Sequence, residues 1–312
     1  MKTSIIIPTY NRPDDLTKCI ESIRRQTVLP DEIIIVDDGN LQEHPLRREC
    51  EAGGIRYRYF KKDVPGLTAS RNAGIGLASG DILFFLDDDV ILFPDYVEQI
   101  LAVYREDAEG AVGGVGGAIA NHKPLNAAHK LRRVVELVFL VTGIREGKVL
   151  PSGFCTNYGM TCFPLKEKTE VDFLSGGVSS FRKEVFRDFA FDAVRFRKYA
   201  MGEDKDFTYR VSKKYRLIYQ PAARLLHMES PKMSPDNYRE GRMFVLYQHL
   251  FFDRYVKKGV ASRFLFYYAL AGYTLTRAVI FAVSPDRGTF DRMRGIVSGI
   301  GAILTGREAI VE

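Results

Sequence analysis

The chain has 312 residues, 46% hydrophobic and 27% charged, with 45 Lys and Arg against 39 Asp and Glu and a net charge of +6. This length and composition exclude a wholly disordered chain and predict two domains, or one large domain with an appendage. Four cysteines in a chain of this length exclude a disulfide scaffold, and none forms a C-x-x-C pair. We expect reduced thiols; the alternative is a loop disulfide between Cys155 and Cys162.

The first 120 residues alternate between short apolar runs and segments with helical spacing. The apolar runs predict strands at residues 4–7, 32–36, 55–60, 82–86 and 111–120. Helical spacing predicts helices at residues 14–26, 67–79 and 94–105. This alternation predicts an α/β fold, with a mainly parallel sheet covered by helices on both faces.

The rest of the chain is less regular. A basic helical segment is predicted at residues 121–144, a loop-like stretch at 145–168 and an apolar run at 217–227. From residue 230 on, the pattern is first that of amphipathic helix and then strongly apolar.

Polar residues follow three of the predicted strands at the point where each ends. These are Pro8-Thr9-Tyr10-Asn11, then Asp37-Asp38, then Asp87-Asp88-Asp89. Ligands of parallel sheets bind beyond the carboxyl ends of the strands, so we expect the three clusters to meet along one edge.

The aspartate triplet predicts a metal site. Adjacent carboxylates repel one another, and burying them unpaired is costly, so they favour a hard cation such as Mg²⁺ or Mn²⁺. The alternative is a solvated turn, but the apolar strand in front of the triplet favours the metal. A carboxylate of Asp37-Asp38 accepts hydrogen bonds from the base or ribose of a nucleotide in one interpretation. In the other, the pair is only part of a turn. The sequence has neither a P-loop nor a dinucleotide-binding glycine motif after the first strand.

Two downstream positions are further candidates. The pair Glu203-Asp204 offers a general base for an incoming hydroxyl, or is a solvated helix start. His227 offers a late metal ligand, or is a structural residue.

Five segments in order over residues 4–230 together resemble family 2 glycosyltransferases of the GT-A fold. They read S-I-I-I-P-T-Y-N-R, E-I-I-I-V-D-D-G, G-L-T-A-S-R-N-A-G, F-L-D-D-D and G-E-D-K-D-F-T-Y-R. The resemblance implies an inverting enzyme that uses a nucleotide-diphosphate sugar and a divalent metal, Mn²⁺ or Mg²⁺.

The resemblance also implies residues that bind the nucleotide-sugar by lining its pocket, contacting its base or lying beside it. These are Pro8, Thr9, Tyr10, Asn11, Asp38, Arg71, Asn72, Gly176 and Gly177, the two glycines letting the sugar approach the backbone.

The remaining roles concern metal and chemistry. The resemblance implies that Asp89 binds the metal and that Asp88 or Asp87 contacts the ribose or sugar, although three consecutive aspartates leave this register ambiguous. It implies His227 as a further metal ligand, Asp204 as the catalytic base and Glu203 beside it for the acceptor.

The resemblance fades after about residue 230, which sets the predicted division. We expect a catalytic domain at residues 1–230, with a nucleotide-binding half at 1–120 and an acceptor-binding half at 121–230. A helical C-terminal region follows at residues 231–312.

This C-terminal region holds most of the excess charge. Residues 230–312 carry 12 Lys and Arg against 7 Asp and Glu, a net of +5, and the apolar stretch 264–283 contains one charge, Arg277. A basic region beside an apolar one predicts a membrane surface as partner. The basic residues are scattered singly, so we expect no nucleic acid.

The apolar stretch has several interpretations. Its length allows a membrane span, although we favour a helix pair lying in the membrane interface or joining the subunits of a homo-oligomer. An ordinary core helix is the remaining alternative. The apolar run near the N-terminus is too short for a signal peptide. We therefore expect a cytoplasmic enzyme, peripheral at the cytoplasmic face of the membrane.

Taken together, the sequence predicts transfer of a sugar to a glycan or lipid-linked acceptor. One alternative is a sugar-phosphate nucleotidyltransferase, which usually has a Gly/Arg/Lys-rich signature where this chain has residues 8–13. The other is a non-catalytic, membrane-bound sugar-nucleotide-binding subunit, against which Asp204 and the aspartate triplet argue.

Overall fold

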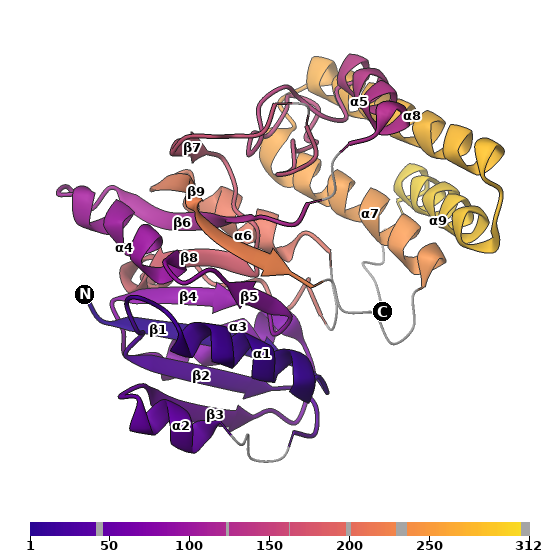
Figure 1. Cartoon of the computed structure of the whole chain (residues 1–312). Coiled ribbons are helices and arrows are strands. Elements are labelled where there is room, and N and C mark those ends of the chain that lie inside the picture. Colours follow the sequence, from indigo (N-terminus) through magenta and orange to yellow (C-terminus); the bar gives the residue numbers. More distant parts are fainter. Residues whose placement is uncertain (42–45, 123–124, 162, 198–200, 229–235, 307–312) are drawn as a thin grey trace. The chain divides into compact units, whose positions relative to one another are not determined.

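The structure is a computed structural model, shown in Figure 1. It describes residues 1–41, 46–122, 125–161, 163–197, 201–228 and 236–306. The contacts divide the chain into two compact units. Unit 1 comprises residues 1–122 and 166–231, and unit 2 comprises residues 123–165 and 232–312. Residues 123–165 therefore pack with the C-terminal region, whereas the sequence pattern assigns them to the acceptor-binding half.

Unit 1 is built on a sheet with nine described strands in the order β3-β2-β1-β4-β8-β6-β9-β5, with β7 paired to β9. The strands are β1 (Thr3–Thr9), β2 (Glu32–Asp37), β3 (Arg56–Lys61), β4 (Ile82–Leu86), β5 (Val90–Leu92), β6 (Val112–Ile119), β7 (Thr169–Val171), β8 (Val178–Arg182) and β9 (Arg216–His227).

The predicted α/β class is confirmed, and the sheet is parallel in one part and mixed in the other. Strands β1 to β4 pair in parallel, and β6 pairs in parallel with β9. By contrast, β8 runs antiparallel to both β4 and β6, and β5 and β7 run antiparallel to β9. The strands β5, β7 and β8 are three to five residues long, and such short runs carry no signal for their direction.

Burial explains why the first strands form. Every residue of β1, β2 and β4 is buried, as expected for central strands covered on both faces. The helix α1 (Pro13–Arg24) begins with a proline and buries Leu16, Cys19, Ile20 and Ile23, the positions with helical spacing.

The other helical segments of unit 1 are α2 (Arg47–Ala52), α3 (Leu67–Leu77), α4 (Tyr96–Glu106), the 3-10 turn η1 (Lys183–Arg187) and α6 (Glu203–Val211). The side chains of Cys19, Cys50 and Cys155 are buried. Cys162 lies outside the described residues, so the alternative of a disulfide between Cys155 and Cys162 also falls outside them.

Unit 2 is helical. It contains α5 (Ala127–Val138), α7 (Asn237–Phe251), the π-helical turn η2 (Phe252–Val256), α8 (Val260–Val283) and α9 (Arg287–Leu304). α8 contains the predicted apolar stretch. Among the described helices it is the one long and apolar enough to cross a membrane, judged by length and composition, and 33% of its most apolar window is buried. Its inner face packs in a core with Phe154, Val245 and Ile296.

Candidate active site

The polar residues that follow β1, β2 and β4 meet at one edge of the sheet, as the sequence predicts. The parallel register brings Thr9 level with Asp37, and the next amide, Asp38 N–H, donates to the carbonyl of Thr9 at 2.9 Å. On the other side of β1, the Thr9 hydroxyl donates to the carboxylate of Asp88 at 2.7 Å.

The middle aspartate of the triplet is held by protein groups. Asp88 is buried, and besides Thr9 it accepts a hydrogen bond from Arg12 at 3.3 Å. Burial disfavours the charged carboxylate and raises the pKa of Asp88 to about 6, while the Thr9 hydrogen bond and the Arg12 charge act in the opposite direction.

Asp87 and Asp89 lie together with His227. One ligand atom from each of the three residues lies within 4.8 Å of the other two. Strand β5 follows directly after Asp89 and pairs with β9 so that Val90 lies opposite His227. His227 Nε2 lies 3.1 Å from an Asp89 carboxylate oxygen.

This group has the chemistry of a metal site. Two carboxylate oxygens and one imidazole nitrogen suit Mn²⁺ or Mg²⁺, with open positions left for substrate oxygens. Burial raises the pKa of Asp87, and the Asp89 charge raises it further against the opposing effect of Arg71. A bound cation would favour the ionised form of these like charges, so the residues present fit the metal that the sequence predicts.

Arg71 connects this group to the beginning of α6. It is buried on α3, where its guanidinium lies 3.6 Å from Asp87 and 3.1 Å from Glu203. Its guanidinium carbon also lies 5.3 Å from the centre of the Phe191 ring. Burial raises the pKa of Glu203 to about 7, and the neighbouring Asp204 charge adds to this, while Arg71 lowers it.

Asp204 is fixed by backbone amides. Its carboxylate accepts from Gly176 N–H at 3.0 Å and from Lys205 N–H at 2.8 Å. At the adjacent Gly177 a Cβ would overlap the carboxylate of Asp87, so a larger residue there would displace that side chain. The two glycines before β8 therefore lie between the aspartate triplet and the predicted base.

Asp38 has several protein partners. It accepts from Ser70 Oγ at 2.7 Å and from Gly66 N–H at 2.9 Å, and its carboxylate lies 2.9 Å from Lys62 Nζ. These contacts anchor the first turn of α3 to the end of β2, close to where the sequence predicts the nucleotide base.

Four other predicted residues differ in their contacts and burial. Asn72 exchanges two hydrogen bonds with the backbone of Phe191, at 2.8 and 3.1 Å. Asn11 adopts a positive φ of 55° and accepts from the amide of Asn40 at 2.8 Å. Pro8 is buried in β1, and Tyr10 is half exposed.

Two basic residues that contact these carboxylates, Arg12 and Lys62, are not among the predicted site residues. Arg12 contacts both Asp88 and, at 3.5 Å, Asp89, whereas Lys62 pairs with Asp38. Arg12 directly follows the predicted pocket residues 8–11, and this adjacency is the signal that could have identified it. Lys62 has no comparable signal.

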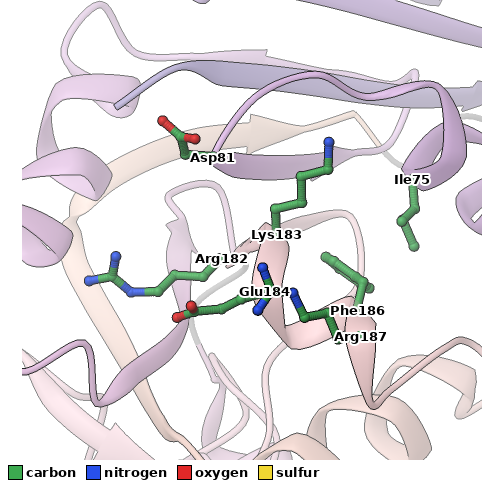
Figure 2. A pocket seen from close by; sticks show the side chains of 7 residues that line it. All are labelled: Ile75, Asp81, Arg182, Lys183, Glu184, Phe186 and Arg187. Atoms are coloured by element: carbon green, nitrogen blue, oxygen red, sulfur yellow. The ribbon is translucent and has the colours of Figure 1, made fainter.

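A separate cavity of about 470 Å³ lies elsewhere in unit 1 (Figure 2). Asp81, which precedes β4, and Lys183 and Arg187 of η1 are among its lining residues. It contains none of the predicted site residues and lies toward the amino end of β4, while the site described above follows the carboxyl end.

Comparison with known proteins bears on the family and the fold. Residues 4–189 match the protein family described as "Glycosyl transferase family 2". An "Uncharacterized glycosyltransferase YwdF" of Bacillus subtilis is 41% identical over 100 residues, which are 32% of this chain and 37% of that protein. A "Validoxylamine A glucosyltransferase" of Streptomyces hygroscopicus is 34% identical over 137 residues, 43% of this chain and 30% of that protein. The chain thus spans about a third of the length of these curated relatives.

Two solved structures share the fold over nearly the whole chain. Residues 1–349 of S. aureus TarS align with a TM-score of 0.59 at 14% identity, covering 99% of this chain and 82% of that one. The second structure is the mannosyltransferase PcManGT from Pyrobaculum calidifontis in complex with GDP-Man and Mn²⁺. It aligns with a TM-score of 0.57 at 15% identity, covering 98% of this chain and 88% of that one. With the family match over more than half of its length, the chain belongs to glycosyl transferase family 2 and has the GT-A fold.

Proposed function

We propose that the chain is an inverting glycosyltransferase that moves a sugar from a nucleotide-diphosphate sugar to an acceptor hydroxyl in one metal-assisted displacement. The observation that carries this proposal is the position of Arg71 between Asp87 and Glu203. Through Arg71, a candidate metal group at the end of β4 and a candidate base at the start of α6 become parts of one site.

Asp87, Asp89 and His227 would hold a divalent cation, Mn²⁺ or Mg²⁺. A cation bound there supplies charge stabilisation to the diphosphate as it leaves. The complex of PcManGT with GDP-Man and Mn²⁺ supports a donor and metal of this class. The pairing of His227 with Asp89 orients the imidazole toward the carboxylates.

The nucleotide-sugar would lie along the edge of the sheet. We assign Pro8, Thr9, Tyr10 and Asn11 to the nucleotide pocket, Asp38 to the base, and Arg71 and Asn72 to the adjoining helix. Asp88 is assigned to the ribose or sugar, and Gly176 and Gly177 to the donor sugar. Asn72 fits a supporting role, because its amide holds the backbone of Phe191 beside Arg71.

Asp204 is proposed as the base. The acceptor oxygen forms a bond to the anomeric carbon while the bond to the diphosphate breaks, with its electron pair leaving on the phosphate oxygen. Asp204 takes the hydroxyl proton, and the amides of Gly176 and Lys205 hold its carboxylate in place. Glu203 is proposed to bind the acceptor. Attack from the face opposite the leaving group inverts the anomeric centre.

We propose that the acceptor is a lipid-linked or polysaccharide glycan. We also propose that the enzyme lies at the cytoplasmic face of a membrane. Support comes from the basic, apolar C-terminal region and from α8. A homo-oligomer remains part of the proposal. The catalytic role is assigned to unit 1, which contains every proposed site residue.

The test is a donor screen with Mn²⁺, followed by product analysis. We expect a nucleotide-sugar to raise the unfolding temperature and to be hydrolysed slowly to a nucleoside diphosphate. Release of pyrophosphate from a nucleoside triphosphate and a sugar phosphate would identify a nucleotidyltransferase instead. Donor binding without hydrolysis or transfer would identify a non-catalytic binding subunit.

A further inference from the structure

The helix α5 has its apolar face directed outward. Leu131, Val134 and Val138 are 68%, 56% and 62% exposed, and their spacing of three and four residues places them on one side of the helix. In a water-soluble protein an amphipathic helix packs this face against the core and exposes its charged face. α5 does the opposite, so its outer face matches an apolar environment better than water.

The inner face of α5 carries a buried carboxylate and two arginines. Glu136 is 2% exposed, and it pairs with Arg133 and, at 3.5 Å, with Arg132. Burying a carboxylate requires such partners, because an unpaired buried charge is strongly destabilising. The ion pairs therefore allow α5 to keep Glu136 and its two arginine partners on the inner side while Leu131, Val134 and Val138 face outward.

The helix α8 has an exposed apolar stripe of the same kind. Phe264, Leu275 and Val279 are 67%, 49% and 52% exposed and lie on the same side of the helix as the exposed Ala271. The helix has 24 residues, a length of about 36 Å at 1.5 Å per residue. Its opposite side is packed in the core of unit 2 through Phe266, among others.

The two stripes adjoin. The Tyr268 hydroxyl of α8 donates to the carbonyl of Val138 at 3.2 Å, and its ring lies 6.2 Å from that of Phe264. The Phe139 ring lies 5.0 Å from that of Tyr268, and a Cβ at Gly272 would overlap Phe139. Figure 1 shows α5 beside α8. We call the side chains of Leu131, Val134, Val138, Phe264, Leu275 and Val279 the α5–α8 surface.

Basic side chains accompany this surface. Lys130 on α5 and Arg263 on α8 are exposed, as are Lys257 and Lys258 ahead of α8 and Arg287 after it. Cations near an apolar helix face favour an anionic lipid surface. Because they flank α8 at both ends, they fit a helix that lies along the membrane.

We propose that the α5–α8 surface lies in the interface of an anionic lipid bilayer, with α8 parallel to the membrane plane. One side of α8 is then in lipid, and the other keeps its contacts within unit 2. The inference goes beyond the proposed glycosyl transfer by naming the surface and its orientation, and its test measures binding alone.

The first experiment is flotation of the full-length protein with vesicles of phosphatidylglycerol and phosphatidylcholine. We expect the wild type to float with the vesicles and the double variant L131E/V134E to lose about tenfold in bound fraction, because two charges replace apolar contacts. The matched control is V64E/V194E, which changes two apolar residues of unit 1 that are 74% and 72% exposed. It should float like the wild type.

The second experiment uses the absence of tryptophan from the chain. The variants F264W, A271W and V279W each carry one tryptophan, and V64W is the control. Quenching of the tryptophan fluorescence by brominated lipids reports how deep the tryptophan lies in the bilayer. Similar shallow depths at all three positions would support a helix parallel to the membrane. A deep A271W between two shallow neighbours would show a spanning helix and overturn the proposed orientation.

Two results would overturn the membrane contact itself. One is unchanged flotation of L131E/V134E. The other is a wild-type oligomer that does not float and that L131E/V134E dissociates, which would make the surface a contact between copies of the chain. Circular dichroism of each variant checks that the helices remain folded.

Discussion

The two units differ in the balance of acidic and basic side chains within their charged clusters. In unit 1 acidic groups outnumber the cations around them: Arg71 lies between Asp87 and Glu203, and Asp204 adjoins them. In unit 2 Glu136 lies between two arginines on the inner face of α5. An excess of carboxylates in a partly buried cluster favours binding of an external cation, whereas a carboxylate already paired with two arginines does not. The contrast separates the proposed metal site of unit 1 from an α5 helix in unit 2 whose buried carboxylate is already neutralised by protein groups.

The largest effect is expected when a carboxylate is removed from the group of Asp87, Asp89 and His227. Asp89→Ala should abolish Mn²⁺-dependent binding of the nucleotide-sugar, because the cation loses one of its candidate ligands and His227 loses its partner. Isothermal titration calorimetry measures this, with Glu109→Ala, an exposed carboxylate outside the site, as control. Normal metal-dependent affinity in Asp89→Ala would remove the main difference between the units.

The next effect concerns the proposed base. Asp204→Asn should lower the transfer rate by about 10³-fold while donor affinity stays within about twofold, because the amide cannot accept the hydroxyl proton. Initial rates and donor titration separate the two quantities. Transfer at the wild-type rate would contradict the assignment of Asp204.

The ion pairs of unit 2 give a smaller effect on stability. Glu136→Gln should lower the free energy of unfolding by about 3 kcal/mol, because two partly buried arginines lose their shared counter-charge. Urea unfolding measures the difference, and Glu109→Gln should change it by less than about 0.5 kcal/mol. An equally small change in Glu136→Gln would show that the inward charges of α5 do not stabilise the unit.

The smallest effect is on pH dependence. Burial raises the pKa of Asp88 to about 6 and that of Glu203 to about 7, so both lose protons as pH rises through this range. If the ionised forms hold Arg12 and Arg71 in place, the transfer rate should increase by about tenfold from pH 5.5 to pH 7.5. Glu203→Gln should remove the part of the increase near pH 7, which pH–rate profiles of both proteins would show.

Much of unit 1 can be predicted from local pattern. Continuous apolar runs predict β1, β2 and β4, and the polar residues after them meet because parallel strands share an edge. The antiparallel direction of β8 could not be predicted, because a strand of five residues fits either direction. The grouping of His227 with Asp87 and Asp89 depends on the pairing of β5 with β9 and is therefore a long-range effect.

By itself, the sequence determined the α/β class, the family and the residue types of the site, because these depend on periodicity and on short motifs. Only the tertiary structure decided which aspartates face His227, that Arg71 joins Asp87 to Glu203, and that α5 packs with α8. Each of these depends on contacts between residues far apart in the chain. The basic and apolar composition of the C-terminal region was visible at once, but the outward direction of Leu131 and Val134 was not. Helical periodicity shows that a helix has an apolar face, and only packing shows on which side that face lies.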